Sequence, residues 1–313
     1  MKTKNLLFLM TALLIIWVAG CTPKAEKPAA TEITVSQKTE SSMAVITEPP
    51  PESAGTSLTV EKLKNSAYYA PFFQRTVKLT NGKAVISDSN GSGSITMLPQ
   101  TAIGDLNEDG VDDAAVLLAE NGGGSGTFVS LVILLNQNGE PRQIGQIPVD
   151  DRPRINSLNI LDGQVVLNAI IHGMNDAMSA PSLQEEQTYR LLNGQVTLVS
   201  LSSQIQNSGD RSVKIDLPLD GQVVTQSVEV KGSMPVAPFE NNLRLRFYDM
   251  DGNSLSESGF MVDAEDVGMP AVFDKTVSLP VLPSGSKVRI ELADLSMADG
   301  SLIALDSVVV EVR

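Results

Sequence analysis

The sequence is poor in cysteine, histidine, aromatic residues and positive charge. Its 313 residues include one cysteine, Cys21, and one histidine, His172, and aromatic residues make up 4% of the chain. A single cysteine excludes a disulfide bond within the chain, and a zinc site built from several Cys and His ligands is excluded for the same reason. Acidic residues outnumber basic ones by 37 to 23, which gives a net charge of −14 at pH 7. Such a surface repels nucleic acid, and no basic cluster offsets it, so we expect no nucleic-acid partner.

The extreme N-terminus is the one segment hydrophobic enough for a membrane. Two lysines precede an apolar run, Leu6–Val18, and small residues then lead to Cys21. This order is typical of a secretory signal, and the run is too short to cross a bilayer comfortably. The segment resembles the lipobox of bacterial lipoproteins. The resemblance implies that residues 1–20 are a signal peptide that is removed and that Cys21 is lipidated; an uncleaved anchor with an incidental cysteine is the alternative.

A lipidated Cys21 would hold the chain on the cell membrane, facing outside the cytoplasm, because several acyl chains anchor far more stably than one. Residues 21–57 are rich in Ala, Thr, Ser, Glu, Lys and Pro and include Pro49-Pro50-Pro51. Such a segment has little to bury, so the composition predicts a disordered tether between the membrane and the folded part.

A first folded domain is expected at residues 58–203, mainly antiparallel β with a minor helix within Lys62–Tyr69. Asn-Gly and Asp-Gly dipeptides recur between apolar or alternating segments, and these dipeptides accept the positive φ angles of tight hairpin turns. They predict four hairpins, which pair 76–79 with 84–87, 128–135 with 143–147, 157–161 with 165–171, and 188–192 with 196–201.

An acidic loop in this domain carries the spacing of calcium ligands. Side-chain oxygens recur at loop positions one, three, five and nine, and a glycine stands at position six, where the chain must turn. The Glu that an EF-hand needs at position twelve is replaced by Val116, and the apolar run that follows favours a strand. A metal-free, Asp-rich turn is the alternative, but three neighbouring carboxylates repel one another unless a cation neutralises them. The sequence predicts a structural calcium site formed by the side chains of Asp105, Asn107, Asp109 and Asp113 and the carbonyl of Val111.

Two resemblances accompany this loop. Residues 104–113 resemble the calcium-binding loop of FG-GAP propeller repeats, but a single copy is present, so the likeness covers one hairpin and not the fold. The wider region 63–199 resembles uncharacterised lipoproteins and secreted proteins of bacteria, through Gly104–Val116, Gly123–Phe128 and His172–Met178. Neither resemblance implies a catalytic role.

Other candidate sites are weaker. Gly122–Gly126 lacks the Lys of a phosphate-binding loop and the last glycine of a nucleophile elbow, so we interpret it as a flexible loop. We expect His172 to be a hydrogen-bonded histidine at a strand end, because no spacing supports a catalytic set with Ser125 and Asp176. Glu185 and the glutamate after it would point to opposite faces of a strand, which makes them a poor acid–base pair.

Residues 211–313 contain short alternating segments at regular spacing, separated by turn signals, which predicts a β-sandwich of about seven strands. Residues 204–210, rich in Ser, Gln, Asn and Gly, are interpreted as an interdomain linker. The predicted strands are 213–217, 223–230, 243–248, 254–261, 271–279, 287–292 and 307–312.

A family pattern in this second domain is carried by Leu217–Val224, Val228–Gly232, Phe239-Glu240, Leu245–Leu255 and Leu292–Val310. Through these segments the domain resembles the immunoglobulin-like domain of bacterial spore-germination proteins. The family's proline after the opening serine and its aromatics before Phe-Glu are missing. The resemblance implies a binding or spacing module on the outer face of cells, without implying sporulation. Within it, Asp251-Gly252 predicts a type I′ hairpin turn, and a second cation at Asp249, Asp251 and Asn253 is the less favoured alternative.

The sequence as a whole therefore predicts a mainly β lipoprotein with a β-rich domain followed by an immunoglobulin-like β-sandwich. We expect a non-enzymatic binding or scaffolding module of the cell envelope, with an envelope protein or polysaccharide as partner. The alternative is an envelope hydrolase acting on polysaccharide or peptidoglycan through acids such as Asp176 and Glu185. A solute-capturing lipoprotein is disfavoured, because those proteins are two-lobed and rich in helices.

Overall fold

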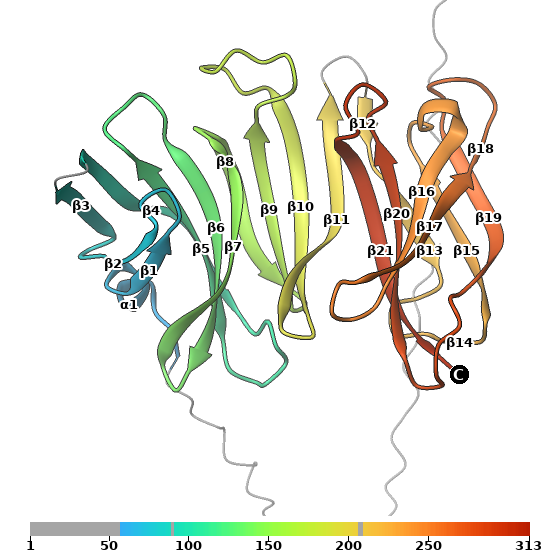
Figure 1. The fold of residues 1–313 in the computed structure, drawn as a ribbon, viewed down its shortest axis with the longest axis horizontal. Helices are drawn as coiled ribbons and strands as arrows, with labels where there is room; N and C mark the ends of the chain where they lie inside the picture. Colours follow the sequence, from blue (N-terminus) through green and yellow to red (C-terminus); the bar gives the residue numbers. More distant parts are fainter. Residues whose placement is uncertain (1–56, 89–90, 206–208) are drawn as a thin grey trace, which may run out of the picture. The chain divides into compact units, whose positions relative to one another are not determined.

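The computed structural model describes residues 57–88, 91–205 and 209–313 (Figure 1). The predicted signal peptide, Cys21 and nearly all of the predicted tether lie outside the described residues. The described part is mostly β-strand, with one short α-helix, as the sequence predicts. No helix within it is long and apolar enough to span a membrane.

The chain enters the fold through helix α1 (Val60–Lys64) and a small hairpin of β1 (Ala67–Ala70) and β2 (Arg75–Lys78). The hydroxyl of Thr59 caps the helix by accepting the N–H of Lys62 at 3.2 Å. The helix begins two residues before the predicted start and ends well before Tyr69. The predicted minor helix near the start of the domain is therefore confirmed, and it gives way to strand β1, whose residues alternate between exposed and buried.

A five-stranded antiparallel sheet follows, in the order β3 (Lys83–Asp88), β4 (Gly91–Gly104), β5 (Asp113–Asn121), β6 (Phe128–Gln137) and β7 (Glu140–Asp151). Nearly every residue of β5 is buried, because the sheet is covered on both faces. Ala114, Val116 and Leu118 pack toward α1 and β1, whereas Ala115 and Leu117 pack toward the next sheet. The apolar run after the acidic loop is therefore a central strand, as predicted.

The first predicted hairpin is wrong in its pairing. Asn81 and Gly82 do have the positive φ angles of a tight turn, 52° and 79°. However, β2 pairs with β1 and β3 pairs with β4, so the turn joins strands of two different sheets. The 14-residue β4 pairs with the whole of β3 and leaves β2 to the short hairpin.

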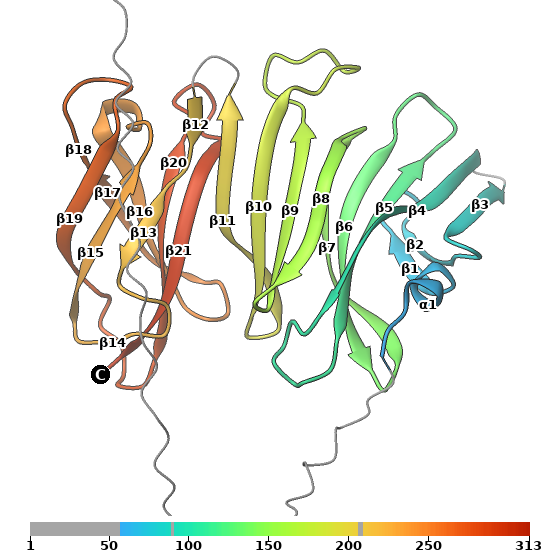
Figure 2. The ribbon, with the colours of Figure 1, turned by 180° about the vertical axis from the view of Figure 1, so that it is seen from behind.

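The second sheet begins with β8 (Arg154–Leu161), β9 (Gln164–Ile171), β10 (Leu183–Leu192) and β11 (Gln195–Ile205). It continues through β21 (Leu302–Val312), β20 (Lys287–Leu295), β16 (Asn242–Tyr248) and β17 (Ser254–Met261), as Figure 2 shows from behind. The remaining three predicted hairpins are confirmed as β6–β7, β8–β9 and β10–β11.

The predicted linker does not separate two sheets. Gln204 and Ile205 end β11, and β12 (Gly209–Arg211) folds back to pair with it. Strand β11 also pairs with β21, where Leu201 lies opposite Leu305 and both pack with Ala293. The pairing of β11 with β21 joins the two regions into one hydrogen-bonded sheet, and the apolar contact stabilises it. The polar composition of the predicted linker did not indicate this pairing.

The C-terminal region is a β-sandwich, as predicted. Its other sheet has the order β13 (Lys214–Leu217), β15 (Ser227–Met234), β19 (Ala271–Ser278) and β18 (Asp263–Ala264). The short strand β14 (Val223–Val224) pairs with β21, and a 3₁₀ turn, η1 (Phe239–Asn241), precedes β16. A buried apolar core that includes Val230, Phe273 and Leu292 fills the space between the two sheets.

The turn between β16 and β17 differs from the predicted type I′. A type I′ turn needs positive φ at both central residues, but at Asp251-Gly252 only Gly252 has one, at 82°. The carboxylate of Asp249 holds the turn by accepting the N–H groups of Asp251 at 3.0 Å and Asn253 at 2.8 Å. These side-chain hydrogen bonds stabilise a different turn conformation.

Candidate functional site

The strand topology places the candidate residues at two opposite ends of the sheets. The acidic loop between β4 and β5 lies at one end, and the β5–β6 and β9–β10 loops lie at the other (Figure 1). The two ends therefore form separate candidate sites, one for a metal and one for a ligand or a reaction.

In the acidic loop the side chains bond to the loop's own backbone. Asp105 accepts the N–H of Gly110 at 2.8 Å, and Asp109 accepts the N–H of Val111 at 2.8 Å. The side-chain amide of Asn107 donates to Asp109 at 2.9 Å. The N–H groups of Asn107, Asp109 and Val111 each bond to the side chain two residues earlier, so Asp and Asn recur at alternate positions because each closes a small Asx turn.

Asp113 is the buried member of the set, with 0% of its surface exposed. One carboxylate oxygen accepts the N–H of Leu106 at 3.0 Å, and the other accepts the N–H of Asn136 on β6 at 2.8 Å. Burial raises the pKa of Asp113, the two amides lower it, and the nearby charges of Asp109 and Asp105 raise it again. The carboxylate of Asp113 thus attaches the loop to β6, and the charges of Asp105 and Asp109 repel it.

The described residues hold no group of three or more His, Cys, Asp or Glu side chains arranged around a metal ion. The donor type fits calcium, which prefers carboxylate and amide oxygens, but these oxygens are directed at backbone amides. Calcium binding by Asp105, Asn107, Asp109, Val111 and Asp113 stays a prediction.

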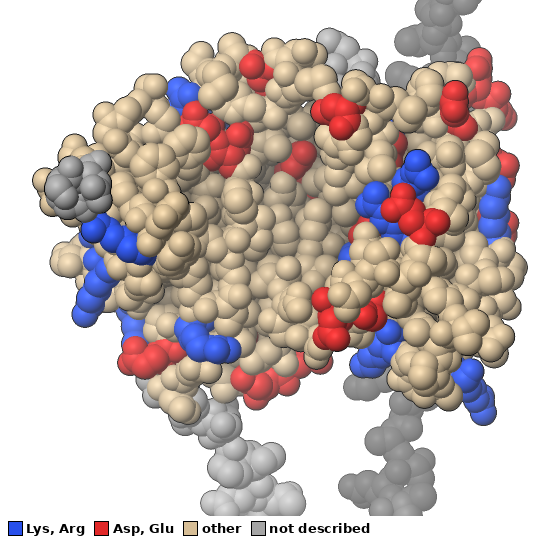
Figure 3. Space-filling model, viewed as in Figure 1, with Lys and Arg blue, Asp and Glu red and all other residues tan. Residues whose placement is uncertain are grey.

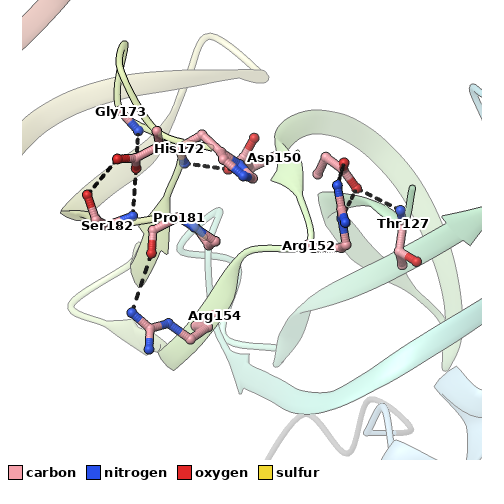
Figure 4. Close-up of polar contacts among 10 residues, drawn as sticks. Thr127, Asp150, Arg152, Arg154, His172, Gly173, Pro181 and Ser182 are labelled. Atoms are coloured by element: carbon pink, nitrogen blue, oxygen red, sulfur yellow. Dashed lines mark hydrogen bonds and ion pairs between the residues drawn. The ribbon is translucent and has the colours of Figure 1, made fainter. Parts of the chain in front are cut away.

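At the opposite end, His172 directly follows β9 and bonds to Asp150 at the end of β7 (Figure 4). Its backbone N–H donates to Asp150 Oδ2 at 2.6 Å, and its Nδ1 lies 2.7 Å from the same oxygen. The bond to Asp150 raises the pKa of His172. The histidine is a hydrogen-bonded residue at a strand end, as the sequence predicts.

Asp151 and Arg152 form the neighbouring ion pair. The guanidinium donates to Asp151 through Nε at 3.1 Å and Nη2 at 2.7 Å, and the N–H of Thr127 donates to the same carboxylate at 2.7 Å (Figure 4). The bond from Arg152 lowers the pKa of Asp151. The pair joins the β7–β8 turn to the start of β6.

Asp176 closes the loop between β9 and β10. It accepts the N–H groups of Gly173 at 2.8 Å and Ser182 at 2.7 Å and the hydroxyl of Ser182 at 2.8 Å (Figure 4). These bonds lower the pKa of Asp176. Asp176 and His172 thus have separate hydrogen-bond partners, and Ser125 is exposed on the β5–β6 loop.

One hollow of about 420 Å³ does bring Asp176 and Glu185 to a common surface, together with Ser182 and Ser203. Glu185 is buried, whereas the neighbouring Glu186 is exposed, so the two point to opposite faces as predicted. Burial raises the pKa of Glu185. The hollow therefore holds one carboxyl group whose pKa is raised and one whose pKa is lowered.

Comparison with known proteins decides the identity of the C-terminal sandwich. Residues 212–301 match the family model described as the immunoglobulin-like domain of bacterial spore germination. The C-terminal domain is immunoglobulin-like. No curated protein and no solved structure matches the chain. The family match lies outside the N-terminal region, residues 57–203, so the resemblances stated for that region stay predictions.

Sequence reasoning missed Asp150, Asp151 and Arg152, which hold the end of the N-terminal region together. The signal was present, since three charged residues in succession between two strands mark a turn. Their partners Thr127 and His172, however, lie 24 and 22 residues away, next to the ends of β6 and β9. The sequence does not give the register that brings these strand ends together. The immunoglobulin-like domain could be recognised without knowledge of strand register, because its family pattern lies in the sequence itself.

Proposed function

We propose that the chain is an extracytoplasmic lipoprotein, held on the membrane through Cys21, whose folded part is a non-enzymatic binding or scaffolding module of the cell envelope. The observation that carries the proposal is the immunoglobulin-like domain at residues 212–301. Its strand β21 pairs with β11 of the N-terminal region, so the two regions share one sheet that can hold a binding surface in a fixed position.

The contacts at the candidate site agree with a non-catalytic role. His172 is bonded to Asp150, Asp151 to Arg152, and the oxygens of Asp176 to its own loop. A general base must reach a substrate proton. The carboxylates of Asp151 and Asp176 are used to fix loops, and the remaining ring nitrogen of His172, Nε2, is buried. The structural calcium of the acidic loop belongs to the same proposal, since a cation would relieve the repulsion at Asp113.

The anchoring step is tested by membrane fractionation of cells that express the full chain or Cys21→Ser. The wild-type chain is expected in the membrane fraction, labelled by a radioactive fatty acid, and the variant is expected unlabelled. Thr22→Ser is the matched control and should behave as wild type. Equal labelling of Cys21→Ser would contradict the anchor.

The binding role is tested by co-sedimentation of the full chain with purified peptidoglycan sacculi, with their attached polysaccharide kept or chemically removed. We expect saturable binding without release of soluble sugar. Absence of binding to every envelope preparation would overturn the proposed function.

A hydrolase is the second candidate, because Asp176 and Glu185 share one hollow and their pKa values are shifted in opposite directions. Such a divergence is the pattern of an acid and a base in glycoside hydrolysis. Glu185→Gln separates the candidates. Release of reducing sugar from sacculi by wild type, lost in Glu185→Gln but kept in Glu186→Gln, would establish the enzyme.

A further inference from the structure

An exposed cluster of aromatic rings lies at the end of the N-terminal region. Phe72 and Phe128 are 50% and 45% exposed, and their rings stack at a centroid distance of 5.6 Å with an interplanar angle of 18°. Phe73 meets Phe72 edge-on at 5.1 Å. Large apolar side chains that stay half exposed in an ordered cluster mark an interaction surface more often than single scattered ones do.

Glycines lie directly against these three rings. A methyl group at Gly122 would overlap the ring of Phe72, and one at Gly93 would lie 2.5 Å from the ring of Phe73. A methyl group at Gly126 would approach Phe128 to 3.3 Å. The glycine-rich loop, interpreted from sequence as merely flexible, thus leaves the space that the rings occupy. Asn121 fixes this loop by donating to the carbonyl oxygen of Gly126 at 2.6 Å.

A buried carboxylate holds the turn that carries two of the rings. Glu120 is 2% exposed, and its Oε2 accepts the N–H of Phe72 at 3.1 Å. Burial raises the pKa of Glu120, while the backbone amides of Phe72 and Phe73 lower it. The hydrogen bond from Phe72 to Glu120 and the close packing against the glycines therefore fix the positions of the rings. A surface fixed in advance loses little conformational entropy on binding.

The rings border a groove between β1 and β7. Two hollows of about 540 and 530 Å³ adjoin there and share Pro71 and Gln146. Phe72 and Phe128 line the first hollow, and Tyr69, which is 45% exposed, lines the second. Uncharged polar side chains also line the two hollows, namely Thr76, Ser130, Gln143 and Gln146. The amide of Gln143 donates to Gln146 at 2.8 Å.

The charge of the groove restricts its occupant. The described residues that line the two hollows include Glu120, Asp150 and Asp151 but no Lys, Arg or His. A polyanion would be repelled, also by the net charge of −14. On the face shown in Figure 3, Lys, Arg, Asp and Glu lie mainly toward the margins, around a hollowed and largely uncharged area. The lining instead suits a neutral ligand with both apolar faces and hydroxyl groups.

An extended peptide fits the groove less well. Peptides that add to a sheet need free backbone groups on the edge strand. At β1, the N–H of Tyr69 is already bonded to the side-chain oxygen of Gln143 at 3.0 Å. A sugar chain does not need this edge, because its ring faces pack on aromatic rings and its hydroxyls bond to polar side chains, such as the hydroxyls of Thr76 and Ser130.

We propose that this groove binds a neutral, linear polysaccharide of the cell envelope, with Phe72 and Phe128 at one subsite and Tyr69 at the next. The proposal rests on the proposed function, since it names the ligand class of the binding module.

The test is isothermal titration of the full chain, in detergent, with three hexasaccharides: chitohexaose, cellohexaose and, as the anionic probe, a hyaluronan hexamer. We expect binding of at least one neutral hexasaccharide and none of the anionic one. The Phe72→Ala/Phe128→Ala double variant should bind about tenfold more weakly or worse, since stacking contacts of this kind are worth about one factor of ten. Phe239→Ala, which removes a ring that is 57% exposed in the immunoglobulin-like domain, is the matched control and should bind as wild type.

Tyr69→Ala keeps the test decisive if the double variant does not fold, and it should weaken hexasaccharides more than disaccharides. Unchanged affinity in a folded double variant would overturn the proposal, as would Phe72-dependent capture of extended peptides from a displayed peptide library with no binding of any oligosaccharide. If sacculi still co-sediment with the double variant at wild-type level, the groove proposal fails while the proposed function stands. If nothing binds sacculi, both fail.

Discussion

The N-terminal region and the immunoglobulin-like domain satisfy their most deeply buried carboxylates in different ways. In the N-terminal region, Asp113 and Glu120 are held by backbone N–H groups of loops and turns. In the immunoglobulin-like domain, Asp294 of β20 pairs with Arg211 of β12. Glu291 of β20 pairs with Arg246 of β16 at 3.4 Å. Amide-held carboxylates fix loop conformations, whereas arginine pairs tie strands together. Buried carboxylates thus order loops in the N-terminal region and join strands in the immunoglobulin-like domain.

The largest effect is expected from breaking an arginine pair. Asp294→Ala removes a carboxylate that is 1% exposed and leaves Arg211 unpaired, so the free energy of unfolding should fall by about 4 kcal/mol. Urea denaturation measures this, with Asp274→Ala, at an exposed pair with Lys231, as a control that should change it by less than about 1 kcal/mol. Equal effects of the two variants would contradict the distinction.

Removing an amide-held carboxylate should cost somewhat less. Asp113→Ala leaves the buried amides of Leu106 and Asn136 without their acceptor, which predicts a loss of about 3 kcal/mol in urea denaturation with EDTA present. Asp112→Ala, at the exposed neighbour, should stay within about 0.5 kcal/mol of wild type. A small effect at Asp113 would mean that the loop is not fastened through this residue.

Calcium should act on the N-terminal region alone. A ligand that binds only the folded state stabilises it by about 2.7 kcal/mol at a hundred times its dissociation constant. Thermal unfolding of the full chain should therefore shift upward with calcium but not with magnesium, and Asp105→Asn/Asp109→Asn should abolish the shift. Asp112→Asn should keep it. No shift at millimolar calcium would leave the loop as an Asp-rich turn.

The smallest effect concerns pH. Burial raises the pKa of Asp306 to about 6, although the amides of Ile215 and Ser307 lower it. Because the folded-state pKa lies above the unfolded value, the folded state binds more protons between about pH 4 and 6. Stability should therefore fall by about 2 kcal/mol as pH rises through this window. In chemical denaturation at pH 4 to 7, Asp306→Asn should reduce the dependence of the free energy of unfolding on pH. If the pH dependence is unchanged in this variant, another group causes it.

Strands and turns with local signals could be predicted from the sequence. Asn138-Gly139, Asp162-Gly163 and Asn193-Gly194 mark three real hairpins, because both residues of these dipeptides accept positive φ at little cost. The pairing of Leu201 with Leu305 could not be predicted, since it joins strands about a hundred residues apart. The role of Gly122 was hidden for the same reason, because Phe72, whose ring fills the space at Gly122, comes from a distant turn.

The most direct measurement of the division between the two regions is hydrogen–deuterium exchange of the full chain with and without sacculi. The account predicts slower exchange on binding in β1, in the β5–β6 loop and in β7, with β15, β16 and β19 of the immunoglobulin-like domain unchanged. Protection confined to the strands of the immunoglobulin-like domain, with the groove unaffected, would contradict it.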